Sequence, residues 1–334
     1  MRAELEELIG TARVFAVPLV EQFRGITARD GVLLRGPAGW AEFAPFHDYP
    51  DADCVPWLRA AVESATVTWP EPVRRRVEVN VTVPVVGPAR AAAIVSASGC
   101  RTAKVKVADP RADLRADAAR VAAVRDALGP TGRIRVDANA AWTVPQACRA
   151  IGVLQHAAGG LEYVEQPCRT LEELAEVRRR AGVLVAADES IRHAADPARV
   201  ALSGAADVAV VKVAPLGGVR AGLQVARVAG LPVVVSSAVD TAVGLAAGLA
   251  LAGALPELPY ACGLGTASLL AGDVCASPPL VTDGFLDVPA WAPEPDRLSG
   301  VLASTRMAAF WLARLRRVAE LLAAGDPNGP GPPL

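Results

Sequence analysis

Eight short runs rich in β-branched residues recur from about residue 77, with longer helical patterns between them. They cover residues 77–86, 103–107, 133–137, 161–165, 183–188, 207–213, 231–237 and 257–263. Strands that alternate with helices predict a parallel sheet, and eight strands close a barrel. An open doubly wound sheet would require a Gly-x-Gly-x-x-Gly turn after an early strand, which the sequence lacks. We therefore predict an α/β fold with a (β/α) barrel over residues 77–282.

The helical patterns between these runs have readable ends. Gly129 closes an apolar stripe that begins near Leu114, as a C′ glycine does. Pro145 follows Thr143 and fits the first turn of a helix. Thr170 with Glu173 forms the pattern of a capping box. These signals support helices over the intervals that the barrel requires.

The rest of the chain has a different pattern. Residues 1–76 contain four predicted short strands, VFAVPLV, FRGIT, GVLLRG and GWAEFAP, broken by Arg-Asp-Gly and Gly-Pro-Ala-Gly turns and followed by a helix near residues 57–67. They predict a small α+β domain. Residues 283–324 end in an amphipathic helix near 310–322 and are expected to return to that domain. Residues 325–334, GDPNGPGPPL, predict a disordered tail.

Composition limits the partners. The chain has 34 basic and 35 acidic residues, which gives no reason to expect a nucleic acid or a membrane, so we expect a small-molecule substrate. Its six cysteines include no Cys-x-x-Cys pair, and the first ten residues carry three glutamates, so we expect a cytoplasmic protein. The apolar run 242–255 falls short of the roughly 18 residues that span a membrane and predicts a buried helix.

Three acids end consecutive strand candidates. Asp137, Glu165 and Asp188 close the third, fourth and fifth runs, 28 and 23 positions apart. Reactive groups of barrel enzymes lie at the C-terminal ends of strands, so these carboxylates should converge. Like charges at close range repel, and a hard cation would resolve the conflict. Three oxygen ligands suit Mg²⁺, so we predict a magnesium site here.

Lysines occur on the second and sixth strand candidates. Lys104 and Lys106 are two positions apart and therefore face the same way, into the barrel, while Val105 and Val107 face the helices. Lys212 lies among valines of the sixth run, opposite the second strand. Lysines would then flank a substrate from two sides, beside the metal. Such a site suits removal of a proton from the carbon next to a carboxylate, because the cation stabilises the enediolate that forms.

At these residues the sequence resembles the enolase superfamily, over almost the whole chain. The matching strings are TAKVKV, RVDANAAW, EYVEQP, AADESI and VVKVAPLGG. The resemblance implies an enolase-superfamily barrel with a smaller α+β capping domain, and Mg²⁺, with Mn²⁺ as a substitute, as cofactor. A lysine base with Mg²⁺ is the general pattern of that superfamily.

Within the superfamily the chain is most similar to the o-succinylbenzoate synthases of menaquinone biosynthesis. The similarity lies in FRGIT, SSAVDTAVGLAAG and LPYACGLGT. It implies Mg²⁺-dependent dehydration of 2-succinyl-6-hydroxy-2,4-cyclohexadiene-1-carboxylate to 2-succinylbenzoate. Lys106 would then act as base and afterwards as the acid for the departing hydroxide. Lys212 would remain charged and stabilise the enediolate.

Other residues separate this activity from related ones. Ser236 and Ser237 replace the histidine expected in mandelate-racemase-like members, and the segment ending at Gly263 lacks the Asp-x-Asp of dipeptide epimerases. N-acylamino-acid racemisation stays open, since the same two lysines can exchange a proton on either face, and so does a non-catalytic barrel scaffold. The remaining candidates for substrate contact or support of the site are Lys104, Asn139, Glu189, Ser236, Ser237, Gly263 and Arg24.

Overall fold

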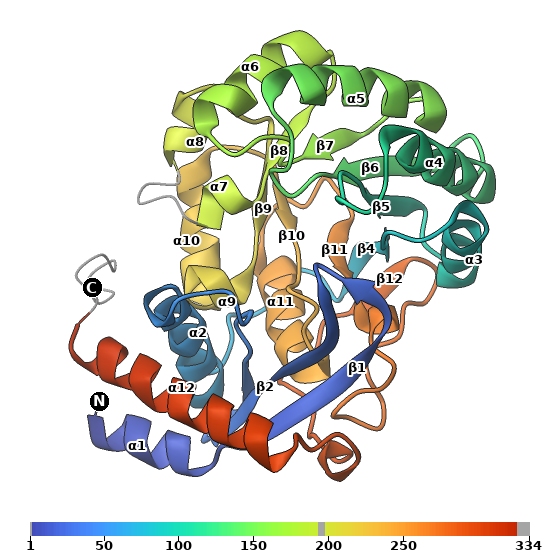
Figure 1. Cartoon of the computed structure of the whole chain (residues 1–334). Coiled ribbons are helices and arrows are strands. Elements are labelled where there is room, and N and C mark those ends of the chain that lie inside the picture. Colours follow the sequence, from blue (N-terminus) through green and yellow to red (C-terminus); the bar gives the residue numbers. More distant parts are fainter. Residues whose placement is uncertain (1, 193–197, 326–334) are drawn as a thin grey trace.

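The computed structural model describes residues 2–192 and 198–325 and contains a barrel of parallel strands (Figure 1). The strands pair in the order β10-β9-β8-β7-β6-β5-β4-β11, and a bridge between Ser236 and Gly263 joins β10 to β11. This confirms the predicted fold. The barrel strands are β4 (Arg76–Val83), β5 (Thr102–Lys106), β6 (Arg133–Asp137), β7 (Tyr163–Glu165), β8 (Val185–Ala187), β9 (Val208–Val211), β10 (Val233–Val235) and β11 (Cys262–Gly265).

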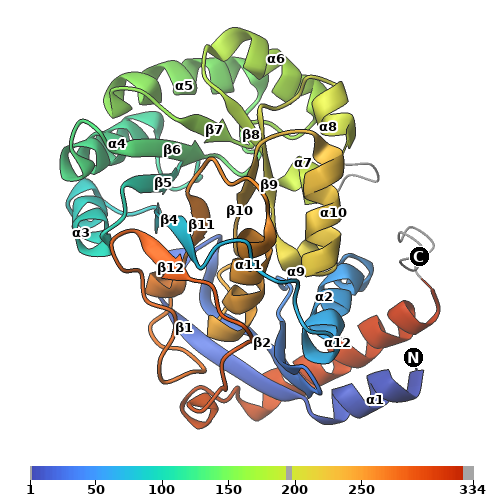
Figure 2. The same cartoon turned by 180° about the vertical axis from the view of Figure 1, so that it is seen from behind.

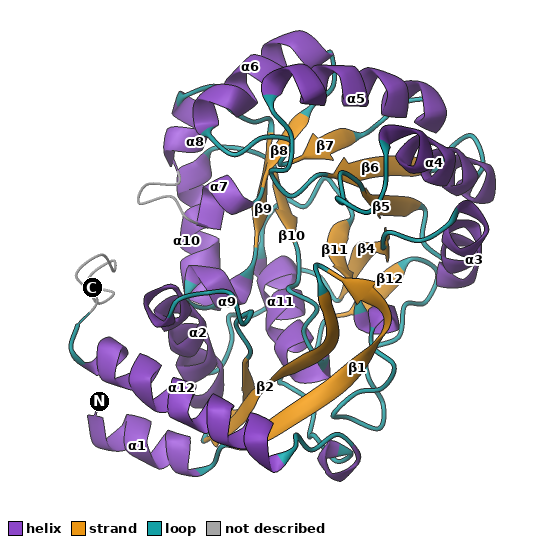
Figure 3. Ribbon diagram, viewed as in Figure 1, coloured by secondary structure: helices purple, strands orange, loops and turns teal. Residues whose placement is uncertain are grey.

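Helices surround the barrel on its outer side (Figure 3). The N-terminal helix caps predicted from the sequence are present: Thr143 makes a capping box with Gln146, and Thr170 makes one with Glu173. The outer helices are α3 (Pro88–Ser98), α4 (Leu114–Leu128), α5 (Val144–Ala158), α6 (Leu171–Ala181), α7 (Glu189–Arg192), α8 (Ala198–Leu202), α9 (Val213–Leu216), α10 (Val219–Ala229) and α11 (Ala242–Ala254).

Helix α11 contains the long apolar run of the sequence. It is 13 residues long, and nearly all its side chains are buried between the barrel and the rest of the protein, as predicted. Within residues 2–192 and 198–325, no helix is both long and apolar enough to cross a membrane.

The two ends of the chain lie side by side next to the barrel, where Figures 1 and 2 show α1 along α12. Trp57, Trp311 and Phe43 are buried in their shared apolar core. We call this unit the capping domain. It consists of α1 (Arg2–Gly10), an antiparallel sheet of β1 (Arg13–Phe23), β2 (Ile26–Gly36) and β3 (Gly39–Phe43), the short helix Asp51–Cys54, α2 (Val55–Thr66) and α12 (Thr305–Ala323).

Two local predictions in the capping domain were wrong. FRGIT is not one strand: Phe23 ends β1, Arg24 and Gly25 make a turn at positive φ, and Ile26 begins β2. The predicted Arg-Asp-Gly turn instead lies inside β2. Gly31 is required there because a Cβ would come within 2.4 Å of Ala44 on the neighbouring segment. The glycine therefore marks a close approach of two segments, not a turn.

The end of the barrel also differs from the prediction. The last strand spans Cys262–Gly265, not residues 257–263, since Pro259 has no N–H to donate to a ladder. In the segment expected to return to the capping domain, β12 (Phe285–Asp287) pairs antiparallel with β4. The chain therefore still pairs with the barrel before α12 reaches the capping domain. The expected disordered tail lies outside the described residues, except for Gly325.

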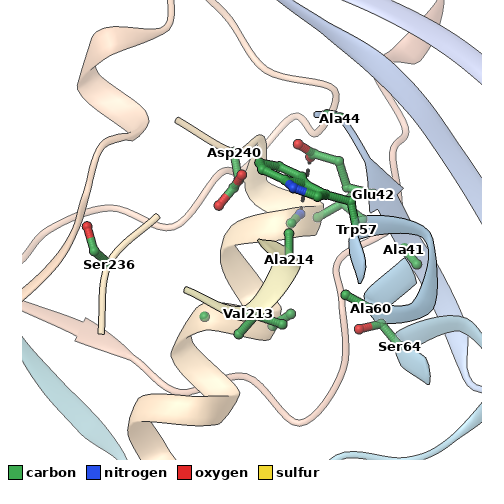
Figure 4. A pocket seen from close by; sticks show the side chains of 14 residues that line it. Ala41, Glu42, Ala44, Trp57, Ala60, Ser64, Val213, Ala214, Ser236 and Asp240 are labelled. Carbon is green, nitrogen blue, oxygen red and sulfur yellow. Dashed lines mark hydrogen bonds between the residues drawn. The ribbon is translucent and has the colours of Figure 1, made fainter. Parts of the chain in front are cut away.

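A buried glutamate joins the capping domain to the barrel. Glu42 of β3 accepts hydrogen bonds from the N–H groups of Thr241 and Gly244, at 3.1 and 3.3 Å, and so caps α11 from a distant part of the chain. Figure 4 shows Glu42 and Asp240 at one small cavity beside Trp57. Burial and the neighbouring Asp240 raise the pKa of Glu42 to about 7, against the opposing effect of Arg29.

This pKa predicts a pH-dependent stability. Between pH 4.5 and 7 the native state keeps a proton on Glu42 that the unfolded chain has lost, so stability falls as pH rises. Glu42→Gln removes the ionisation and should weaken this decline by up to about 3 kcal/mol between pH 5 and 8. Urea unfolding of both proteins at the two pH values measures it. Identical pH dependence of the two proteins would contradict the prediction.

Candidate active site

The three predicted acids lie at the ends of neighbouring strands. Asp137 and Glu165 are the last residues of β6 and β7 and are paired in register, and Asp188 follows β8. All three are at most 2% exposed. The parallel ladder therefore brings three carboxylates to one end of the barrel, as the sequence predicts from their shared position at strand ends.

The three predicted lysines meet these acids. Lys104 Nζ lies 2.9 Å from Glu165 Oε1 and 3.3 Å from Asp137 Oδ2. Lys106 Nζ lies 2.5 Å from Asp137 Oδ2, and Lys212 Nζ lies 2.5 Å from Asp188 Oδ2. Val105 and Val107 are buried in the layer between strands and helices, so the alternation along β5 points both lysines inward. Lys104, Lys106, Asp137 and Glu165 form one connected cluster, and the Lys212–Asp188 pair lies close enough to influence the pKa of its acids.

No other lysine exists in this chain. Lys104, Lys106 and Lys212 are the three lysines among its 34 basic residues, and the remainder are arginines. An arginine stays protonated at any ordinary pH, whereas an amine can release its proton and occupies less space. Every Lys or Arg position outside this site is an arginine, and all three lysines lie within the site. The lysines can be counted in the sequence alone, and the count supports the assignment of a functional site more strongly than the spacing of the residues does.

Burial and neighbouring charges shift the pKa values in the cluster. Burial, followed by the charge of Asp137, raises the pKa of Glu165 to about 7, against the opposing effect of Lys104. Burial also acts to raise the pKa of Asp137, but the ammonium groups of Lys106 and Lys104 outweigh it and hold that pKa well below its usual range. For Lys104 burial acts to lower the pKa, and Glu165 and Asp137 outweigh it, so the pKa is raised. Strongly perturbed groups gathered at strand ends are typical of functional sites.

The donor set suits a hard divalent cation, since it consists of buried carboxylates with no sulfur or imidazole. In the arrangement observed, each carboxylate is engaged by an ammonium group. Among the residues that the structure describes, no three acids, histidines or cysteines lie together closely enough to hold a metal ion. A bound cation would therefore take carboxylate oxygens that the lysines now contact.

Most of the other predicted residues border a small cavity beside the three lysines. Asn139 Oδ1 accepts a hydrogen bond from Lys106 at 2.7 Å, and its Nδ2 donates to Glu189 at 3.2 Å. The wall of the cavity includes Lys104, Lys106 and Lys212, together with the predicted residues Arg24, Asn139, Ser236, Ser237 and Gly263. Gly263 keeps this wall close to β10, because a Cβ there would lie 2.5 Å from Ser236 Oγ.

Sequence reasoning missed several residues of the site. Phe23 places its ring 5.2 Å from Lys106 Nζ, and Phe46 stacks under the Arg24 guanidinium at 4.7 Å. Thr82 and Thr266 also line the cavity, and Thr266 shares a 2.7 Å hydrogen bond with Ser237. The aromatic residues come from the capping domain, whose position over the barrel no local pattern reveals.

Gln166 is a further missed residue, directly after Glu165. Its Oε1 accepts the N–H of Asp188 at 2.9 Å, and its Nε2 donates to Ser190 Oγ at 2.8 Å. It is fully buried and has a positive φ of 39°. Gln166 therefore ties the ends of β7 and β8 together and fixes two of the acids relative to each other.

Two cavities meet at the β1–β2 turn. The inner one, beside the lysines, has a volume of about 30 Å³, which has room for water alone. The outer one has a volume of about 480 Å³ and is lined by Gln22, Arg24, Lys106 and Arg111 among others. Phe23, Arg24, Lys106 and Asn139 border both. Lys106 therefore faces both spaces, and the β1–β2 turn contributes Arg24 to the wall of each.

Comparison with known families agrees with this arrangement. Residues 88–293 match the family described as enolase C-terminal domain-like, and residues 14–65 match the enolase N-terminal domain-like family. The muconate lactonizing enzyme of Pseudomonas fluorescens superposes with a TM-score of 0.74 at 23% identity, covering 90% of this chain and 97% of that one. At that identity the likeness shows the fold alone.

Two curated relatives are much closer in sequence. The o-succinylbenzoate synthase of Thermobifida fusca is 58% identical, over 91% of this chain and 95% of its own length. The o-succinylbenzoate synthase of Mycobacterium ulcerans is 49% identical, over 96% of this chain and 97% of its own length. With both family models matched and this identity over nearly the whole length, the chain belongs to the enolase superfamily and, within it, to the o-succinylbenzoate synthase family.

Proposed function

We propose that this protein is a dehydratase that converts 2-succinyl-6-hydroxy-2,4-cyclohexadiene-1-carboxylate to 2-succinylbenzoate in menaquinone biosynthesis. The reaction breaks the C1–H bond next to the ring carboxylate and the C6–O bond, and water leaves. The observation that carries the proposal is that the chain's three lysines border one cavity, from β5 and from the end of β9. Membership of the o-succinylbenzoate synthase family supports the substrate.

We assign the proton transfer to Lys106. Its ammonium group is held between Asp137 Oδ2 and Asn139 Oδ1, at 2.5 and 2.7 Å, and faces the cavity. A neutral Lys106 would take the C1 proton and return it to the departing hydroxide. Lys212 faces the same cavity from the end of β9 and would remain charged, stabilising the negative charge that develops on the substrate carboxylate.

A divalent cation, Mg²⁺ with Mn²⁺ as a substitute, would be held by Asp137, Glu165 and Asp188. When bound, it supplies positive charge that favours the enediolate over the ground state. With Lys106 neutral, the three acids and the two charged lysines together carry one negative charge, so a divalent cation leaves one net positive charge. That charge would favour binding of the substrate, which has two carboxylates. Lys104, which contacts Glu165 and Asp137, would hold these acids in place.

The remaining contacts follow from the cavity wall. Arg24 is exposed at the β1–β2 turn, where it can meet the succinyl carboxylate as the substrate enters from the outer cavity. Ser236, Ser237 and Gly263 line the inner cavity, which must widen beyond its volume of about 30 Å³ for the substrate ring to reach them. Glu189 acts through Asn139 and so supports the position of Lys106. A cytoplasmic location remains the expectation from the sequence.

Two other functions make different predictions. N-acylamino-acid racemisation would use the same two lysines, one for each face of the α-carbon. A non-catalytic scaffold would need neither metal nor lysines. Assaying the cyclohexadiene substrate and N-succinyl amino acids in parallel, with a titration of Mg²⁺, separates the three. Dehydration without any dependence on a divalent metal would contradict the proposal, and absence of both activities with no metal binding would favour the scaffold.

The metal assignment predicts a coupled loss in Asp188→Asn. The amide keeps the shape of the side chain but removes one of three charged ligands, so affinity for Mg²⁺ should fall at least about tenfold and turnover should fall with it. Calorimetric titration of Mg²⁺ and steady-state assays measure both. Asp126→Asn, which changes an exposed acid on α4, is the control and should leave both unchanged. Unaltered Mg²⁺ affinity in Asp188→Asn would refute the ligand assignment.

A further inference from the structure

A buried ion pair on α4 holds the backbone immediately after Lys106, on both sides of Val107. Asp117 and Arg120 lie one turn apart, form a salt bridge, and are each 2% exposed. Arg120 Nη2 donates to the carbonyl oxygen of Lys106 at 3.0 Å, and Asp117 Oδ2 accepts the N–H of Ala108 at 2.9 Å. The pair therefore binds the last peptide groups of β5, immediately before and after Val107.

The backbone at this point does not follow an ordinary strand. Ala108 has a φ of +63°, a conformation that an alanine adopts only when its surroundings impose it. The last ladder bond runs from Val107 N–H to the Asp137 carbonyl, at 3.0 Å. Arg120 Nη1 also donates to the Val86 carbonyl, at 3.2 Å, and so links the end of β5 to the segment after β4. These contacts determine where the Lys106 side chain begins.

Stability alone does not account for the pair. Buried ion pairs lose much of their attraction to desolvation, and an apolar pair of similar volume is often equally stable or more so. Neither side chain lines the cavity that the three lysines border. What the pair does that an apolar pair cannot do is bind the Lys106 carbonyl and the Ala108 N–H, directly after the lysine.

We infer that Asp117 and Arg120 are positioning residues for Lys106. They fix the end of β5 so that the ammonium group reaches both Asp137 Oδ2 and Asn139 Oδ1. Without them the peptide after Lys106 relaxes from the strained turn and the lysine shifts relative to the substrate carbon. The inference rests on the proposed role of Lys106 as base, and a misplacement of about 1 Å in such a group costs on the order of 10²-fold in rate.

The test replaces the pair by apolar residues of similar size, Asp117→Leu with Arg120→Met. We expect kcat to fall about 10- to 100-fold, with KM and Mg²⁺ affinity changed less than about threefold. The control is Arg125→Met on the same helix. Arg125 also binds backbone carbonyls, those of Gly129 and Gly132 at 2.7 Å, but it does so at the C-terminal end of the helix. It should leave kcat unchanged.

A second measurement reports directly on the environment of the Lys106 side chain. Since the chain has three lysines, protein labelled with ¹³C at lysine Cε gives three side-chain signals, which Lys→Arg variants assign. In the metal-free double variant, the chemical shift of the Lys106 signal should change, while the Lys212 signal stays. Arg125→Met should move neither. A loss of stability without a positioning role would leave the Lys106 signal in place.

Wild-type kcat and an unmoved Lys106 signal in the folded double variant would overturn the inference. If that variant does not fold, Arg120→Lys replaces it, because an ammonium group has no planar fork to reach two carbonyls and a carboxylate together. The same loss in kcat and the same shift are expected, and their absence has the same meaning. A Lys106→Ala variant with full activity would instead refute the proposed function, and the spectrum would still report on the position of Lys106.

Discussion

Lys106→Ala should lower the dehydration rate by about 10²- to 10⁴-fold, the contribution of a general acid and base. The variant leaves Asp137 Oδ2 and Asn139 Oδ1 without the ammonium group that now lies 2.5 and 2.7 Å from them. Lys106→Arg should be nearly as damaged, because a guanidinium stays protonated and cannot accept the C1 proton. Steady-state assays of both variants, with Mg²⁺ at saturation, measure the loss.

The control for a general effect of charge is Arg101→Ala, an exposed cation just before β5. It should keep wild-type turnover. Lys106→Arg dehydrating at the wild-type rate would show that Lys106 is not the base. Loss of Mg²⁺ affinity equal to the loss of rate would instead assign Lys106 to holding the acids.

Lys212 should respond differently, because its proposed role needs a charge and no proton transfer. Lys212→Ala should lose about 10²- to 10³-fold in kcat, the size expected when one donor to a developing negative charge is removed. Lys212→Arg keeps the charge and should retain more dehydration activity than Lys212→Ala. Racemisation would require Lys212 to exchange protons itself, so any such activity should vanish in Lys212→Arg.

Deuterium exchange at the α-carbon of an N-succinyl amino acid, followed by NMR in each variant, separates the two roles. Exchange that continues in Lys212→Arg and stops in Lys106→Ala would agree with a single base at Lys106. Equal loss of dehydration in Lys212→Arg and Lys212→Ala would mean that the position requires an amine, and the electrostatic role would then be wrong.

The barrel could be predicted because its signals are local. Each run of β-branched residues is bounded by glycine, proline or a helix cap, so the number and order of strands follow from short segments. The period of two along β5 places Lys104 and Lys106 on one face, and parallel strands bring their carboxyl ends to the same end of the barrel. The register of β5 with β6 and of β6 with β7 then aligns Lys106, Asp137 and Glu165.

The errors arose where a local signal had two meanings. The Asp-Gly step at residues 30–31 is typical of a turn, but Gly31 is there to let β2 approach Ala44. The Arg24–Gly25 step, predicted as strand, makes the turn between β1 and β2, from which Arg24 borders both cavities. Whether a glycine forms a turn or allows two segments to pack closely depends on a neighbouring segment, which the local sequence does not show.

The sequence by itself determined the strand order, the helix caps and the chemistry of the site, because period-two alternation and capping patterns act over a few residues. Tertiary structure alone decided which groups support that site. Glu42 caps α11 from 199 positions away, and Arg120 and Asp117 bind the backbone directly after Lys106 from a helix that carries no motif for it. Such contacts join segments that come close together only after the chain has folded. The spacing of residues in the sequence therefore does not predict them.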